Sequence, residues 1–290
     1  MTRSSNARGA DRTRASAKKR KRKPGPGWIP NYHGAWAMIT VPVLIGVVKS
    51  GFVWEHLLLL GLWWIGYFAF FATSLWLRSG RKARYLPPVR TYWLAMLPFA
   101  LGVLVTAPHL VKWLPVFAPL VAVAAWASAN RQDRSMINNV ATILAACLML
   151  PVAYDMGVGG ATSTANGGPG GLDGVVNAVS GGDWPEIWLV TGVVAWYFVG
   201  TALYVKTNIR ERGMRRWYVA SVVFHAVGAT AVVGLASCGA VTWWLAALCL
   251  VILLRAIFVP LYGHNNGWLP AKVIGMGEVV ASVALFVVVI

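Results

Sequence analysis

Charged residues are scarce in this sequence, and their scarcity excludes an ordinary soluble domain. Only 12% of the 290 residues are Asp, Glu, Lys or Arg, whereas 58% are hydrophobic, and the mean hydropathy is +0.61. A typical soluble domain has about 25% charged residues. We therefore expect an all-α protein, a polytopic membrane helical bundle. Its 16 tryptophans fit this class, because amphipathic rings favour the two bilayer interfaces.

Cysteines and metal-binding patterns are also scarce. The three cysteines, Cys147, Cys238 and Cys249, lie in or beside apolar runs, so they predict small buried side chains rather than a disulfide framework or a metal site. The sequence contains neither a GxxxxGK[ST] phosphate loop nor an HExxH zinc motif. Only His225 is well inside an apolar run, which argues against a haem held by two histidines. We predict no metal site, and the sequence leaves any cofactor unknown.

The first 27 residues have no apolar run. They contain ten Lys or Arg and one Asp, which is +9 of the total formal charge of +17. Such a segment cannot bury a core, so we expect a disordered basic cytoplasmic tail at 1–27, followed by a transmembrane domain at 28–290. We interpret the run "KKRKRK" as a topology determinant that rests on anionic lipid, at about 1 kcal/mol per basic residue, and we expect no nucleic acid partner.

Nine apolar segments follow the tail. A helix that spans the hydrocarbon core needs about 20 apolar residues, and the first of the nine segments is short. Residues 108–111 are the whole connection between the third and fourth segments, so we expect a tight hairpin there. The Gly-rich segment 157–184 predicts an outer loop. The predicted spans are 34–49, 53–77, 91–108, 112–129, 137–156, 185–205, 217–237, 240–259 and 270–290.

The basic residues predict the orientation of these spans. If the N-terminus is cytoplasmic, the inner segments 1–33, 78–90, 130–136, 206–216 and 255–272 hold ten, five, two, five and two Lys or Arg, which is 24 of the 26 in the chain. The two exceptions are Lys49 and Lys112. The positive-inside rule therefore predicts a cytoplasmic N-terminus and, with nine helices, an outer C-terminus.

Ionisable residues inside apolar segments are the first candidates for a functional site. Glu278 and His225 are each the ninth residue of a predicted helix that starts on the cytoplasmic side, which places Glu278 ~12 Å below that surface. Arg255 is predicted near the cytoplasmic end of the eighth helix. We expect these groups to line a cavity open to the cytoplasm. The alternatives are a structural Glu278–Arg255 pair, a His225 bonded to a backbone carbonyl, and an Arg255 that reaches the interface.

Polar groups at the cytoplasmic mouths of the helices complete the candidate ligand-binding set. In "PNYHGAWAMITVPVLIG", Pro30 and Asn31 can simply start a helix. His33 has no role in a cap, so we predict that it faces the cavity with Arg255 and Glu278 and contacts a phosphate or carboxylate. The full set is Asn31, His33, Arg78, Arg81, Arg210, Glu211, Arg212, His225, Arg255 and Glu278; catalytic residues stay unknown.

Four stretches resemble the YwiC-like family of bacterial membrane proteins: "PNYHGAWAMITVPVLIG", "SLWLRSGRKARYLPP", "YVKTNIRERG" and "PAKVIGMGE". The resemblance covers roughly residues 28–290 and implies a multi-pass protein of the bacterial cell membrane. It implies no particular activity. The helix count and the two polar inner loops are also similar to UbiA-type prenyltransferases. Those enzymes hold Mg²⁺ with aspartates in these loops, whereas this sequence has "RSGRKAR" and "KTNIRERG" there.

Three functions remain open at this level. The first is binding of an anionic lipid, an isoprenoid phosphate or a small anion in the cytoplasm-facing cavity, since arginine binds phosphate without a metal. The second is transport of a small molecule. The third is an accessory or scaffold role in a membrane complex. The sequence does not decide whether the protein is an enzyme, and it does not give the oligomeric state.

Overall fold

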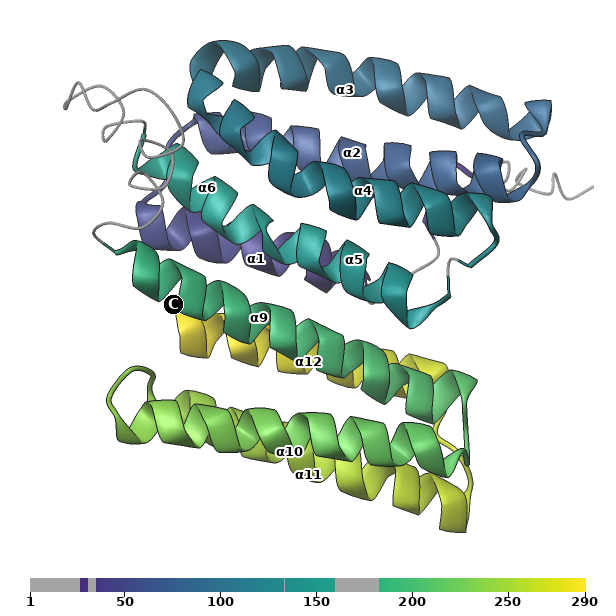
Figure 1. Cartoon of the computed structure of the whole chain (residues 1–290), viewed down its shortest axis with the longest axis vertical. Coiled ribbons are helices and arrows are strands. Elements are labelled where there is room, and N and C mark those ends of the chain that lie inside the picture. The colour runs from purple at the N-terminus through teal and green to yellow at the C-terminus, as the bar shows by residue number, and fades with distance from the viewer. Residues whose placement is uncertain (1–26, 31–34, 133, 160–182) are drawn as a thin grey trace, which may run out of the picture.

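The described part of the chain is helical throughout. The computed structural model describes residues 27–30, 35–132, 134–159 and 183–290, and within them no strand occurs (Figure 1). Eight helical units are long and apolar enough to cross a membrane, and α1 is a shorter apolar helix of 16 residues. The predicted all-helical bundle of about nine helical units is confirmed for the described residues, and eight of these units qualify as membrane spans. Residues 1–26, most of the Gly-rich segment, Asn31 and His33 lie outside the described residues.

Short connections join the helices, except between α6 and α9, where residues 158–183 intervene. A 3₁₀ turn precedes α3, another precedes α4, and a π-helix extends α9. In chain order the elements are α1 (Ala35–Ser50), α2 (Glu55–Arg78), η1 (Ala83–Tyr85), α3 (Leu86–Thr106), η2 (Pro108–Trp113), α4 (Leu114–Ala129), α5 (Met136–Cys147), α6 (Met149–Gly157), α9 (Trp184–Val205), η3 (Lys206–Arg210), α10 (Arg215–Ser237), α11 (Trp243–Asn266) and α12 (Ala271–Val289).

Prolines explain two differences from the predicted spans. Helix α3 begins earlier than predicted, at Leu86, because prolines in its first turn cost no backbone hydrogen bond. The predicted fifth span consists of two helices, α5 and α6, which meet at Leu148. Pro151 has no N–H to donate to the carbonyl three to four residues earlier, so a helix weakens at that point.

The predicted position of Arg255 was wrong. We expected the eighth helix to end at residue 259, with Arg255 near its cytoplasmic end. Helix α11 runs to Asn266, which puts Arg255 at the middle of its 24 residues. The predicted span ended just before Pro260, whereas the helix continues through this proline for about two more turns. Arg255 therefore does not belong to an inner loop, and 23 of the 26 basic residues remain in the predicted inner segments.

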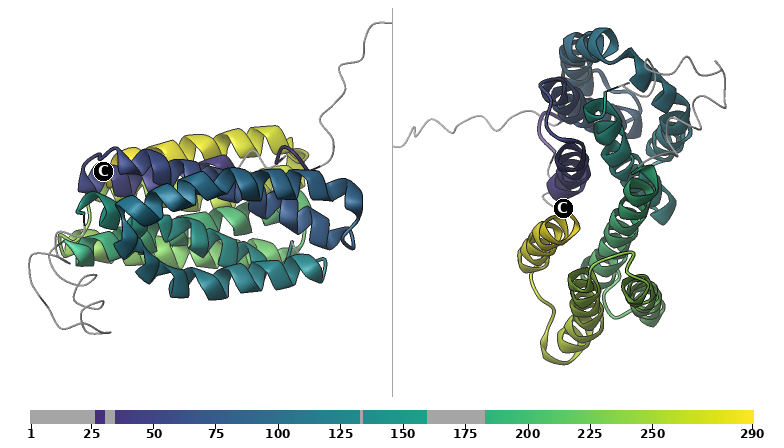
Figure 2. Two further views of the ribbon diagram at one scale, coloured as in Figure 1. Left: turned by 90° about the horizontal axis from the view of Figure 1, so that it is seen from above. Right: turned by 90° about the vertical axis from the view of Figure 1, so that its left-hand side faces the viewer.

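The helices pack in layers along the long axis of the molecule. Figures 1 and 2 show α2, α3 and α4 at one end, α1 with α5 and α6 next, then α9 with α12, and α10 with α11 at the far end. The central units are the most covered: 56% of the apolar window is buried in Met136–Gly157 and 61% in Trp184–Arg210, against 11% around α3. The outer faces carry large apolar side chains such as Leu94, Leu101 and Val105, as a lipid-facing surface requires.

A close helix contact fixes α1 in the bundle although α1 is short. Gly46 lies so close to α6 that a Cβ atom there would overlap the backbone oxygen of Leu150. Small residues permit this kind of backbone approach between membrane helices. Two of the three cysteines, Cys147 and Cys249, are buried as predicted, whereas Cys238 is exposed at the end of α10, so that part of the prediction was wrong.

Candidate functional site

A cavity of about 640 Å³ lies between the N-terminal and C-terminal helices. Parts of α1, α2, α4, α5, α9, η3 and α12 line it. Most of the lining residues lie in the half of each membrane-spanning unit toward the start of α1, and Trp63, Phe117 and Ser282 lie near the middle of theirs. The cavity therefore extends from that end of the bundle to about its middle. In the other half the space is filled by buried side chains such as Ile45, Leu150, Tyr154, Trp184 and Ile187.

Four cations line the cavity at the end of the bundle where α1 begins. They are Arg78 at the end of α2, Arg134 just before α5, and Lys206 and Arg210 in η3. We call this the cationic end. Arg78 and Arg134 also border an adjoining hollow of about 490 Å³, to which Arg131 contributes a further guanidinium. Among the described lining residues of the cavity, Glu278 is the only acid.

The body of the cavity is apolar. Trp63, Phe70 and Phe71 of α2, Phe117 of α4 and Phe198 of α9 contribute aromatic side chains to its wall. An apolar pocket with a few convergent polar groups is the usual form of a small-molecule site. Cations at one end and aromatic rings beyond them fit a ligand with an anionic head and an apolar body.

The π-helix η3 presents two of these cations. Its wider turn follows α9 directly, and π-turns within helices often mark functional sites. Thr207 is buried and donates to the backbone oxygens of Leu203 at 2.9 Å and Trp217 at 3.1 Å. Lys206 Nζ lies 3.7 Å from the centre of the Trp217 ring. These contacts fix η3 against α10, and both Lys206 and Arg210 line the cavity.

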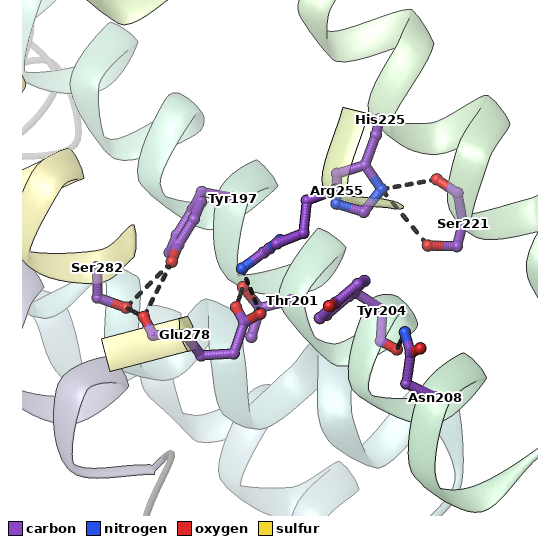
Figure 3. A network of polar contacts seen from close by, with 9 residues as sticks. All are labelled: Tyr197, Thr201, Tyr204, Asn208, Ser221, His225, Arg255, Glu278 and Ser282. Atoms are coloured by element: carbon purple, nitrogen blue, oxygen red, sulfur yellow. Dashed lines mark hydrogen bonds and ion pairs between the residues drawn. The ribbon is translucent and has the colours of Figure 1, made fainter. Parts of the chain in front are cut away.

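Glu278 is the buried carboxylate of the site, with 4% of its surface exposed. Its Oε2 accepts a hydrogen bond of 2.8 Å from the Thr201 hydroxyl, and its Oε1 lies 2.5 Å from Nη1 of Arg255 (Figure 3). The Arg255 guanidinium also stacks over the Tyr204 ring at 4.3 Å. These contacts join α12 to both α9 and α11, so the predicted structural pairing of Glu278 with Arg255 is present.

Arg255 has hydrogen-bonding capacity to spare. Within the described part of the chain, its buried Nε and Nη2 atoms have no hydrogen-bond partner. A buried donor without a partner costs free energy, about 1–3 kcal/mol or more for a charged group. Arg255 itself does not line the cavity, whereas Glu278 does. The carboxylate therefore lies between the cavity and the guanidinium.

His225 belongs to the packing around this pair. The side chain is fully buried, and Nδ1 lies 2.7 Å from the backbone oxygen of Ser221, one turn earlier in α10. Its Nε2 faces Gly200, where a Cβ atom would come within 2.9 Å. His225 does not line the cavity, so the structure favours the alternative in which it bonds a carbonyl of its own helix.

The predicted site residues divide into three groups. Arg78, Arg210 and Glu278 line the cavity, and Arg255 lies directly behind Glu278. The remaining described residues, Arg81, Glu211, Arg212 and His225, do not line this cavity, and their part in ligand binding stays a prediction. Arg81 lies in the turn after α2, Glu211 follows η3, and Arg212 folds back so that its Nε donates to the Asn208 carbonyl at 2.7 Å. Asn31 and His33 lie outside the described residues.

Several site residues were not predicted. Arg134 and Lys206 line the cavity, and Thr201, Tyr197 and Tyr204 surround the ion pair on α9. Tyr197 lies 3.1 Å from the Ser282 hydroxyl and donates to the Glu278 backbone oxygen at 3.4 Å. A helical spacing of three to four residues relates 197, 201, 204 and 208, and this polar face was the signal available in the sequence. Across residues 27–30, 35–132, 134–159 and 183–290, no three His, Cys, Asp or Glu form a possible metal site.

Comparison with known proteins gives a consistent family assignment. The family model for the YwiC-like protein matches residues 29–154. The uncharacterized protein YwiC of Bacillus subtilis (strain 168) is 29% identical over 254 residues, which cover 87% of this chain and 92% of that protein. An uncharacterized protein of Haemophilus influenzae is 27% identical over 198 residues, or 68% of this chain and 74% of the relative. No solved structure matches.

Proposed function

Because the chain belongs to the YwiC-like family of multi-pass membrane proteins, and its relatives' names state no activity, we propose a function from its cavity: the protein binds an anionic lipid, an isoprenoid phosphate or a small anion there. The observation that carries this proposal is the cavity of about 640 Å³ with four cations at one end and an aromatic wall beyond them. Arginine and lysine bind phosphate through charge-assisted hydrogen bonds. An apolar chain gains about 0.8 kcal/mol per buried CH₂ group.

The proposed ligand enters from the cytoplasm. This orientation rests on the charge asymmetry of the sequence, which predicts that the cationic end lies on the cytoplasmic side. A head group at Lys206, Arg210, Arg78 and Arg134 stays close to water at the membrane surface. The chain then extends toward Phe198 and the middle of the bilayer, where burial is most favourable.

Two glycines of α12 allow a test of the cavity by a matched pair of variants. A Cβ atom at Gly275 or at Gly277 meets open space, so neither substitution forces a clash near the backbone. Gly275 lines the cavity, whereas Gly277 is exposed on the outer surface of the helix. We expect Gly275→Phe to fill the cavity and to abolish binding of farnesyl phosphate by the purified protein. Gly277→Phe should retain it.

The cations provide an independent test of the head-group position. Lys206→Gln with Arg210→Gln removes two charged partners, each worth about 1.5–3 kcal/mol in a hydrogen bond, so farnesyl phosphate should bind more than tenfold more weakly. Equal binding by wild type, the Gly275→Phe variant and this double variant would place any ligand outside the cavity. Failure of the wild-type protein to bind farnesyl phosphate, phosphatidylglycerol or inorganic phosphate would refute the proposal.

Small-molecule transport is the second candidate, and the closed half of the bundle favours it. The rings of Trp113, Trp184 and Trp188 lie within 6.3 Å of one another, centre to centre, at the end opposite the cationic end. A site open to one side and sealed on the other is one state of an alternating-access cycle. Flux of a bound anion into proteoliposomes would support transport, whereas binding without flux favours a stationary ligand.

A further inference from the structure

Behind the cavity lies the guanidinium of Arg255, which has two spare hydrogen-bond donors in the described part of the protein. A buried guanidinium normally has its N–H groups paired. Here Nη1 contacts Glu278, while in the described part of the protein Nε and Nη2 find no acceptor. The Tyr204 ring under the guanidinium compensates its charge in part but accepts no ordinary hydrogen bond. Arg255 is therefore equipped to bind a second anionic group.

The Glu278 carboxylate separates the cavity from that guanidinium. Glu278 and Thr201 line the cavity, and Arg255 lies behind them without lining it. Glu278 is thus an anion already bound at Arg255. For another anion to take its place, the carboxylate must move aside and lose its charge, because an unpaired buried carboxylate costs several kcal/mol.

We propose that Arg255 is a second, deeper anion-binding position, and that Glu278 covers it until it takes up a proton. This inference rests on the proposed function, since it uses the same cavity. A ligand monoanion pairs with Arg255, the Glu278–Arg255 contact breaks, and one proton taken up from the buffered solution converts the carboxylate to a carboxylic acid. One proton balances the charge of one monoanion, so the buried site stays neutral, and a phosphodiester is a monoanion that suits a guanidinium.

We assign the proton to Glu278 after considering the other titratable and charged groups that surround it. Helix α9 supplies Tyr197, Thr201 and Tyr204, and α11 supplies Arg255 (Figure 3). From α10 comes His225, whose Nδ1 is already engaged by Ser221. The described part of α1 has one charged residue, Lys49, which pairs with Glu186 at the opposite end. Toward the cationic end lie Lys272 on α12 itself and the four cations of the cavity.

Counting protons during binding tests this inference. The two probes are dimethyl phosphate, which is small and soluble, and dihexanoyl phosphatidylglycerol, a lipid head group; both keep one negative charge across the neutral pH range. Calorimetric titration of the full chain in buffers of different ionisation enthalpy should give one proton taken up per anion bound. The dissociation constant should rise about tenfold per pH unit, as one-proton linkage requires.

Substitutions test whether Glu278 is the group that takes up the proton. Glu278→Gln should bind the same probe with no proton uptake and no pH dependence, while the control Glu55→Gln, at the opposite end, should behave as wild type. Should Glu278→Gln fail to fold because Arg255 loses its counterion, the double variant Arg255→Gln/Glu278→Gln keeps the net charge and should lose the deep position and its proton uptake.

The outcomes distinguish this inference from the proposed function. Uptake of one proton with dimethyl phosphate alone identifies a soluble phosphodiester as the ligand, and uptake with the lipid probe alone identifies a lipid head group; both support the inference. Binding without proton uptake overturns it and leaves the proposed function standing. If neither probe binds, the deep position is refuted, and farnesyl phosphate binding decides the proposed function separately.

Discussion

At the scale of single residues, two lysines on the predicted outer side form ion pairs that differ in the burial of the acidic partner. Lys112 pairs with Asp155 at 2.9 Å, and the Asp155 side chain is only 4% exposed. Trp113 Nε1 donates to the same carboxylate at 2.8 Å. Lys49 pairs with Glu186 at 2.8 Å, but Glu186 is 56% exposed. Both exceptions to the positive-inside rule are thus compensated by acids close to them.

The two ion pairs predict different losses in the free energy of unfolding when the lysine is replaced by methionine. Lys112→Met leaves Asp155 buried without its counterion, which should lower the free energy of unfolding by about 3–5 kcal/mol. The matched change Lys49→Met removes a partner that water can replace, so its effect should stay below about 1 kcal/mol. Unfolding of both variants in mixed micelles measures the difference. Equal losses would show that the burial of Asp155 has no energetic consequence.

The buried ion pair shows which site residues could be predicted from the sequence alone. Glu278 and Arg255 were predicted because an ionisable side chain within an apolar run needs a partner, and they contact each other. Arg81, Glu211 and Arg212 were included because they lie in polar loops, but sequence neighbours in a loop point in different directions. Arg134 and Lys206 were missed for the same reason: which basic residues face a cavity depends on the packing of other helices.

At the scale of helices, apolar length predicted the elements well and their ends less well. All nine predicted spans correspond to helical units, since each must satisfy its own backbone hydrogen bonds in lipid. The ends of α3 and α11 were missed: α3 begins at Leu86, before the predicted residue 91, and α11 continues past the predicted end at residue 259, with Pro260 inside the helix. The π-helix η3 could not be predicted, since its wider turn depends on contacts with Trp217 on the next helix.

The contact between α9 and α10 predicts a sharp contrast between two glycines of one helix. At Gly228 a Cβ atom would overlap the Trp196 ring, which is itself stacked on Phe224, whereas at Gly234 it meets open space. Gly228→Ala should therefore lower the unfolding free energy by about 1–3 kcal/mol, the usual cost of overpacking.

Gly234→Ala is the control, and it should be neutral or stabilising by up to about 1 kcal/mol, because alanine favours the helix. Thermal unfolding of the two variants in the same detergent compares them directly. A Gly228→Ala variant as stable as Gly234→Ala would mean that α9 and α10 separate easily at this point.

At the scale of the whole molecule, the arrangement of the helices agrees with the charge distribution. Figure 1 shows the start of α1 and the C-terminus at opposite ends of the bundle, as an odd number of crossings requires. The cations Arg78, Arg134, Lys206 and Arg210 gather at the end where α1 begins. Their common end gives the cavity a single polar mouth, which the proposed function places at the cytoplasmic surface.

Reporter fusions test this orientation in cells. A fusion at Arg84, between α2 and α3, should be active only as a cytoplasmic reporter, because its loop belongs to the cationic end. Fusions at the C-terminus and at Gly239, between α10 and α11, should both report the outer side. The Gly239 fusion is the internal control, since it depends on the orientation of the bundle but not on α12. If the Gly239 fusion reports the outer side while the C-terminal fusion reports the cytoplasm, α12 does not cross the membrane. Glu278 would then lack the buried position on which the deeper anion site depends.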